Sequence, residues 1–138
     1  WNLLYRRTEF GSQILNANFS PDGKYVVTAS ADATARIWNI QPNENPILKG
    51  HTAYVADADF SADGNFIATA GWDYSARLWG KTGKIIHVLK EHKHYAVDFC
   101  RFTNKSSYLI TFSRDGFIRF WDLHGNQIGK IGGKSPEC

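Results

Sequence analysis

Residues 60–79 read Phe60-Ser-Ala-Asp-Gly-Asn-Phe-Ile-Ala-Thr-Ala-Gly-Trp-Asp-Tyr-Ser-Ala-Arg-Leu-Trp79, and this stretch decides the fold. Residues 19–38 and 102–121 repeat its pattern without a gap, so that each copy opens on phenylalanine and closes on tryptophan. The closing tryptophans are 41 and 42 residues apart, from Trp38 to Trp79 and from Trp79 to Trp121. A period of roughly 40–45 residues is typical of a repeated unit of four short strands. The sequence therefore predicts three copies of one β-rich unit.

Each copy is predicted to contain short strands joined by turns. One strand is rich in β-branched and aromatic residues, which favour strands. Turn-forming residues precede it, and a second turn follows at an aspartate. A further strand is expected after each tryptophan, over residues 46–48, 84–89 and 126–131. No segment has a helical periodicity of useful length, so the predicted fold class is all-β.

The three copies resemble the WD40 repeat family. That family's unit carries Gly-His near its start, Ser or Thr on the second strand, Asp in the following turn and Trp-Asp at its end. The resemblance covers about residues 1–133 and implies part of a WD40-type β-propeller, with three four-stranded antiparallel blades and one extra N-terminal outer strand. The matching residues are Thr28, Asp32 and Trp38 in the first copy, Gly50, His51, Thr69, Asp73 and Trp79 in the second, and His92, Thr111, Asp115, Trp121 and Asp122 in the third.

Several positions depart from the family pattern. The first copy has Phe10 where the histidine is expected, nine residues before Phe19. The third copy has His92 ten residues before Phe102, which indicates one inserted loop residue. Only Trp121-Asp122 is a literal Trp-Asp pair.

The expected organisation follows from the copies. Residues 1–9 are assigned to the outer strand of a preceding blade, residues 10–50, 51–91 and 92–133 to three blades, and residues 134–138 to a tail or the start of a next loop. Three blades cannot close a ring that needs about four to eight. Closure requires further blades of the same chain or a second copy. A fragment of a longer chain is favoured, because the strand over residues 1–9 would need inner strands upstream, and the absence of methionine adds to this.

His51, Asp73 and Thr69 are the residue types of a nucleophilic triad. The same set recurs as His92, Asp115 and Thr111, each time with a tryptophan. The resemblance implies a structural tetrad in which Asp accepts from His, His from the hydroxyl, and the hydroxyl from the indole N–H. Such a chain satisfies buried polar groups, so the copies are interpreted as non-catalytic.

The composition and charge of the chain limit which other classes of function fit the sequence. The net charge of +3 is too mild to indicate nucleic acid binding, which stays an unlikely alternative. Cys100 and Cys138 form neither a disulfide framework nor a metal motif, and His92 and His94 alone are weak evidence for a metal. No cofactor or metal is expected. No stretch is long and apolar enough to span a membrane, and a reducing, cytoplasmic location is the simplest interpretation.

The predicted function is a protein-protein interaction scaffold that binds other proteins or peptides through variable loops on a rigid repeat. The alternative is a nucleic-acid-binding or enzymatic propeller surface. Trp72 has Ala31 and Arg114 as its counterparts, so it either packs on a neighbouring loop or contacts a partner. Tyr, Trp and Arg are enriched at binding hot spots. The candidate partner-binding residues are Gln13, Tyr54, Trp72, His94, Tyr95 and Arg114.

Overall fold

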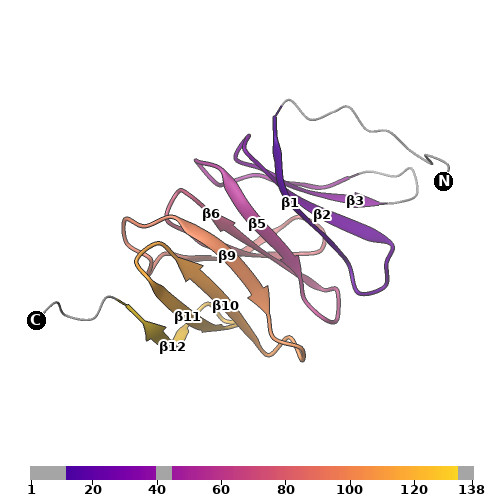
Figure 1. The fold of residues 1–138 in the computed structure, drawn as a ribbon. Coiled ribbons are helices and arrows are strands. Elements are labelled where there is room, and N and C mark those ends of the chain that lie inside the picture. Colours follow the sequence, from indigo (N-terminus) through magenta and orange to yellow (C-terminus); the bar gives the residue numbers. More distant parts are fainter. Residues whose placement is uncertain (1–11, 40–44, 134–138) are drawn as a thin grey trace, which may run out of the picture.

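The structure is a computed structural model that describes residues 12–39 and 45–133. These residues form three four-stranded antiparallel sheets, which we call blades 1, 2 and 3 (Figure 1). The described ranges contain no helix, and the predicted all-β class and blade architecture are confirmed. The predicted N-terminal strand over 1–9, Phe10 and the tail over 134–138 lie outside the described residues. The strands are β1 (Ile14–Phe19), β2 (Tyr25–Ser30), β3 (Ala35–Asn39) and β4 (Ile47–Leu48) in blade 1, β5 (Val55–Phe60), β6 (Phe66–Gly71), β7 (Ala76–Gly80) and β8 (Ile85–Leu89) in blade 2, and β9 (Val97–Phe102), β10 (Tyr108–Ser113), β11 (Phe117–Asp122) and β12 (Gln127–Gly132) in blade 3.

The turns between the first and second strands explain why the copies align without gaps. Gly23 and Gly64 adopt φ angles of +70° and +72°, which glycine accepts without steric cost. In blade 3 Ser106 takes the same role at φ +53°. The strain of this residue is offset because the Ser106 hydroxyl accepts a hydrogen bond from the Ala62 N–H of blade 2.

The blades stack side by side, with the first strands β1, β5 and β9 adjacent (Figure 1). The sheet face that carries the closing tryptophan is called the leading face, and the opposite face is called the trailing face. The leading face of blade 2, with Ile67 and Trp79, packs on the trailing face of blade 1 in one apolar core. Leu109 and Trp121 pack in the same way on the trailing face of blade 2. Burying each large apolar side chain contributes about 1.5–3 kcal/mol, so these two cores stabilise the stack.

Side chains of the first strands also tie neighbouring blades together. Asp57 accepts a hydrogen bond from the Cys100 N–H at 3.0 Å, and Asp59 accepts one from the Phe102 N–H at 3.1 Å. Both carboxylates therefore satisfy amide groups at the free edge of β9, which would otherwise be unpaired. Burial raises the pKa of Asp57 and of Asp59 above the ordinary value. The sequence analysis did not single out these inter-blade contacts.

Candidate functional site

Two kinds of loop open on one side of the blades. Val55 pairs with Gly71 and Val97 pairs with Ser113, so the first strand of a blade begins where its second strand ends. The loop before the first strand and the turn after the second strand therefore lie at the same edge of each sheet. We call this side of the molecule the loop face.

A hydrogen-bonded network anchors the loop face of blade 2. His51 Nδ1 lies 2.9 and 3.0 Å from the two carboxylate oxygens of Asp73, and His51 Nε2 lies 2.7 Å from Thr69 Oγ1. The Trp79 indole N–H donates to the same hydroxyl at 2.9 Å. Burial alone would raise the pKa of Asp73, but hydrogen bonding to His51, the charge of His51 and the hydrogen bond from Ser75 together hold it well below its usual range. The network has the connectivity expected for a tetrad, and it is a structural anchor.

Blade 3 makes only part of this network. His92 Nε2 lies 2.9 Å from Thr111 Oγ1, and the Trp121 indole N–H donates to that hydroxyl at 2.9 Å. No hydrogen bond joins His92 Nδ1 to Asp115, which accepts from Arg119 and Ser113 instead. The expectation that Asp115 completes a tetrad with His92 is wrong.

The two networks differ at one residue position that lies against the histidine and the aspartate. A Cβ atom on Gly71 would lie 2.3 Å from His51 Nδ1 and 2.7 Å from Asp73 Oδ1, so only glycine allows their contact. Blade 3 carries Ser113 at the equivalent position, and its hydroxyl donates to Asp115. Burial, with the added charge of Arg119, lowers the pKa of His92 to about 4. His92 is therefore a neutral imidazole at neutral pH.

Blade 1 shows the shortest form of the network. The Trp38 indole N–H donates to Thr28 Oγ1 at 2.9 Å. Asp32 accepts from the backbone N–H and the hydroxyl of Thr34, at 2.9 and 2.6 Å, and caps its own turn. The carboxylate of Asp32 therefore shapes a turn here.

Four side chains gather on the loop face at the boundary of blades 2 and 3, and we call them the loop-face cluster: Tyr54, Trp72, Asp98 and Arg114. The rings of Tyr54 and Trp72 stack with centroids 5.2 Å apart at 25°. The Trp72 indole N–H donates to Asp98 Oδ1 at 2.9 Å, and Arg114 Nε donates to Asp98 Oδ2 at 2.8 Å. Arg114 Cζ also lies 4.5 Å from the Trp72 ring centroid. Trp72 thus packs on a neighbouring blade and still stays 37% exposed, so both interpretations of this residue describe part of its environment.

The other predicted partner-binding residues lie outside this cluster. Gln13 is exposed in blade 1, and its backbone carbonyl accepts from the Ala31 N–H at 2.9 Å. His94 is exposed and meets the Tyr74 ring edge-on, with centroids 6.1 Å apart. Tyr95 is exposed in the same loop. Of the six partner-binding residues predicted from the sequence, three therefore belong to the loop-face cluster and three lie outside it.

Asp98 is the member that the sequence analysis missed. It lies in the run Val97-Asp98-Phe99-Cys100, whose other members are apolar. Leu15 and Ala56 occupy its position in the other two copies. A carboxylate that replaces apolar residues at one repeat position is the signal that would have found it.

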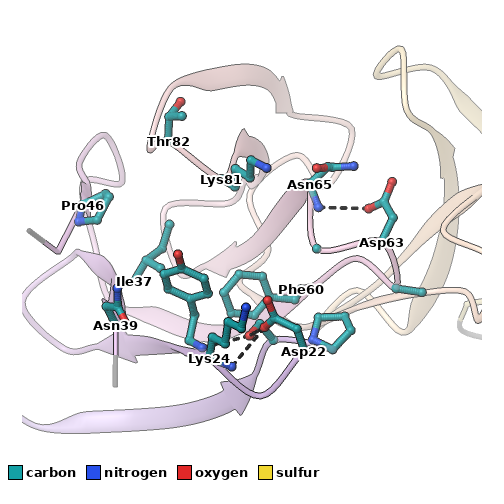
Figure 2. Close-up of a pocket in the computed structure, with 15 residues that line it drawn as sticks. Asp22, Lys24, Ile37, Asn39, Pro46, Phe60, Asp63, Asn65, Lys81 and Thr82 are labelled. Atoms are coloured by element: carbon teal, nitrogen blue, oxygen red, sulfur yellow. Dashed lines mark hydrogen bonds between the residues drawn. The ribbon is translucent and has the colours of Figure 1, made fainter. Parts of the chain in front are cut away.

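A groove of about 1100 Å³ lies on the side opposite the loop face, between blades 1 and 2 (Figure 2). Its floor includes Ile37 and Phe60, and two equivalent turns form part of its wall. Asp22 and Asp63 fold those turns, because each accepts the backbone N–H two residues later at 3.0 Å. Hydrogen bonds from Ser20 and Ser61 are the largest influence holding the pKa values of these two carboxyls below the usual range. These carboxylates are committed to turn geometry.

The described part of the chain offers no grouping of three or more His, Cys, Asp or Glu side chains that could hold a metal ion. Within the same ranges, no helix is long and apolar enough to cross a membrane.

The fold and the geometry of the loop face together identify the described part of the chain as a segment of a β-propeller built from repeated blades. The family model for the WD domain, G-beta repeat, matches residues 4–39, 43–80 and 83–122, and the chain therefore belongs to the WD40 repeat family. The match over 43–80 spans β4 to β7, so the sequence repeat is offset from the blade by one strand. WD40 repeats are in general non-catalytic scaffolds for protein interactions. No curated protein matches the chain.

Proposed function

We propose that this chain is a non-catalytic scaffold that binds other proteins or peptides through the loop-face cluster. The observation that carries the proposal is the stacked pair of Tyr54 and Trp72, two large aromatic side chains held partly exposed at the boundary of two blades. Aromatic anchors of this kind dominate the energy of many protein interfaces. A reducing, cytoplasmic setting belongs to the same proposal and is supported by the free, buried thiol of Cys100.

Hydrogen bonds and ring stacking within the chain hold the cluster in this arrangement without a partner. Tyr54 leads into β5, where the network of His51 and Asp73 fixes its loop, and the Trp72 N–H donates to the Tyr54 carbonyl at 2.9 Å. Asp98 on β9 then holds the indole from the next blade. A preformed surface loses little conformational entropy on binding, so it favours affinity.

The chemistry of the cluster favours an apolar contact over an anionic one. Both carboxylate oxygens of Asp98 accept from Arg114, at 2.8 and 3.2 Å, so the guanidinium charge is already paired. Its remaining role is to cover part of the Trp72 ring. We infer a partner segment that buries an aromatic or aliphatic side chain against Tyr54 and Trp72.

The test is selection of binding peptides from a random displayed library, followed by affinity measurements on variants. Tyr54→Ala removes an anchor whose ring stacks on Trp72 without breaking the bond to Asp98. We expect roughly thirtyfold weaker binding, which corresponds to ~2 kcal/mol. Tyr108→Ala is the matched control, because Tyr108 is 47% exposed against 46% for Tyr54 and lies at the other end of its blade. Equal losses in the two variants, or peptides that bind equally well to Tyr54→Ala, would contradict the proposal.

A further inference from the structure

Tyr74 adopts a backbone conformation that disfavours its own side chain. It lies in the turn after β6, two residues beyond Trp72, and has a φ angle of +69°. The equivalent residues are Ala33 in blade 1, with φ +68°, and Gly116 in blade 3, with φ +82°. All three turns therefore use the left-handed region, which glycine adopts freely and a bulky side chain adopts only at a steric cost. Of the three residues, tyrosine is the least suited to this position.

Packing within the chain does not explain why this position holds a tyrosine. Tyr74 is 45% exposed and belongs to neither inter-blade core. Its ring meets the His94 imidazole edge-on across the boundary of blades 2 and 3, with centroids 6.1 Å apart, but His94 is itself exposed. Burial therefore offsets little of the steric cost. Backbone strain that burial does not offset is typical of binding sites.

The loop that carries His94 also departs from the repeat. The loop before β9 is one residue longer than the loop before β5, because the histidine of blade 3 lies one residue further from the strand that follows it. Within the longer loop Lys93 has a φ angle of +55°, which is also in the left-handed region. His94 follows it directly and contacts Tyr74. Two independent departures from the repeat, an aromatic side chain in one blade and a longer loop in the next, therefore meet at one point.

This point lies beside the loop-face cluster, at the same boundary of blades 2 and 3. Trp72 and Tyr74 are two residues apart in one turn, so their Cα atoms are at most about 7 Å apart. In an extended peptide, side chains two residues apart point to the same side and are also separated by about 7 Å. One extended segment can therefore contact both aromatic residues with two of its side chains.

We propose that Tyr74 and His94 form a second contact point for the partner of the loop-face cluster, and that this partner is an extended peptide segment with two apolar or aromatic anchor side chains two residues apart. The inference rests on the proposed function. One anchor packs on Tyr54 and Trp72, and the other packs on the rings of Tyr74 and His94. Exposed rings of this kind gain from burial against an apolar group. Tyr74 thereby favours segments with two anchors over segments with one.

Peptides selected from a random displayed library on the wild-type chain test this second contact. Tyr74→Asn removes the ring and keeps a residue that tolerates the left-handed turn. Ala33→Asn is the matched control, because it places the same residue in the equivalent turn of blade 1, away from the cluster. We expect Tyr74→Asn to bind the peptides at least fivefold more weakly without a lower Tm, and Ala33→Asn to leave their affinity unchanged. A lower Tm with unchanged affinity would show that Tyr74 is a packing residue.

A double-mutant cycle between the chain and the peptides separates contact from indirect effects. We expect alanine to weaken binding at two peptide positions that are two residues apart. The loss at one position should shrink at least threefold in Tyr74→Asn, and the loss at the other should shrink in Tyr54→Ala. A single anchor position, or no coupling of any position to Tyr74, would overturn the inference even where Tyr54→Ala still weakens binding. Peptides indifferent to both variants would refute the proposed function itself.

Discussion

Blades 2 and 3 carry histidine, threonine, aspartate and tryptophan at equivalent positions, but they connect them differently. In blade 2 the chain of hydrogen bonds runs without a break from Trp79 to Asp73. In blade 3 the chain of hydrogen bonds ends at His92, and Asp115 accepts hydrogen bonds from Arg119 instead. Identical residue types therefore do not guarantee an identical network. The side chains between them decide which partners meet.

In both arrangements the hydrogen bonds satisfy the carboxylate of a partly buried aspartate. In blade 2 the carboxylate accepts hydrogen bonds from His51, Ser75 and the Thr52 N–H, and Arg77 adds a longer one at 3.4 Å. In blade 3 Arg119 is nearly buried and makes the main contact. Although burial opposes the shift, hydrogen bonds from Arg119 and Ser113 lower the pKa of Asp115 to about 2. The anchor of blade 3 is an ion pair, and the anchor of blade 2 centres on the histidine.

The largest expected effect follows from that ion pair. Asp115→Ala leaves the Arg119 guanidinium buried without its carboxylate, and breaking a buried pair costs about 3–5 kcal/mol. Asp32→Ala should cost less than ~1 kcal/mol, because Arg36 lies 3.8 Å from Asp32 and both side chains are partly exposed. Urea unfolding of both variants measures the difference. Adding Arg119→Met to Asp115→Ala should restore much of the lost stability, because no buried charge is then left unpaired. If adding His92→Ala restores it instead, Asp115 interacts chiefly with the histidine and the prediction is wrong.

Gly71→Ser is the next largest change and should convert blade 2 toward blade 3. The new Cβ would lie 2.3 Å from His51 Nδ1, so the histidine and Asp73 must separate. We expect a loss of about 2 kcal/mol, within the range for a buried polar group left unsatisfied. Thermal unfolding gives the loss, and NMR of the His51 ring nitrogens reports whether the bond to Asp73 survives. An unchanged Nδ1 signal would show that serine fits without breaking the contact.

The fold was largely predictable from the sequence, because the repeat fixes strand positions and turn chemistry at the same time. The strand predicted over residues 126–131 appears as β12 over Gln127–Gly132, and the short strand after Trp38 appears as β4 over Ile47–Leu48. The pairing of Val55 with Gly71 brings the two loops that carry Tyr54 and Trp72 to the same edge of blade 2. Local periodicity was sufficient for these features.

The candidate site was only partly predictable, because its contacts depend on atoms that the repeat pattern does not encode. Ser113 and Gly71 differ by a hydroxymethyl group, and in blade 3 the Ser113 hydroxyl donates to Asp115, whereas in blade 2 His51 contacts Asp73 beside Gly71. Asp98 reaches Trp72 across a blade boundary, 26 residues away in sequence. Such contacts depend on inter-blade geometry at the scale of an ångström.

The third prediction uses the pH dependence of stability to follow the titration of His92. The pKa of His92 is lowered from 6.5 to about 4, so the unfolded chain takes up a proton at a higher pH than the folded chain. Stability should therefore fall as pH drops from about 6.5 to about 4, with a slope of up to ~1.4 kcal/mol per pH unit, and this group should contribute no further loss below that window. The lowered pKa values of Asp73 and Asp115 act below pH 3.8, outside the same window. The raised pKa values of Asp57 and Asp59 act above pH 3.8 and oppose this slope, so the contribution of His92 is read as the difference from a variant without it. Unfolding free energies measured across pH check the slope.

His92→Gln is the control for this pH dependence, since glutamine has no proton to gain in that window. The variant should show a flatter profile between pH 6.5 and 4 at whatever absolute stability it retains. A slope that persists in His92→Gln would assign the titration to another group.

The smallest expected effect comes from the reverse exchange, Ser113→Gly, and it asks which residue keeps His92 from Asp115. Serine occupies the position that glycine leaves open in blade 2, but Arg119 also holds the Asp115 carboxylate. Loss of the Ser113 hydroxyl removes its bonds to Asp115 and Arg119, so we expect a net change in stability below ~1 kcal/mol. The informative readout is the pKa of His92, measured by NMR titration. If serine is the barrier, Asp115 approaches Nδ1 in the variant and the pKa rises from about 4, because a nearby carboxylate favours the imidazolium. If the pKa stays at about 4, Arg119 alone holds Asp115 away, and the glycine of blade 2 permits its network only because Arg77 holds Asp73 more loosely.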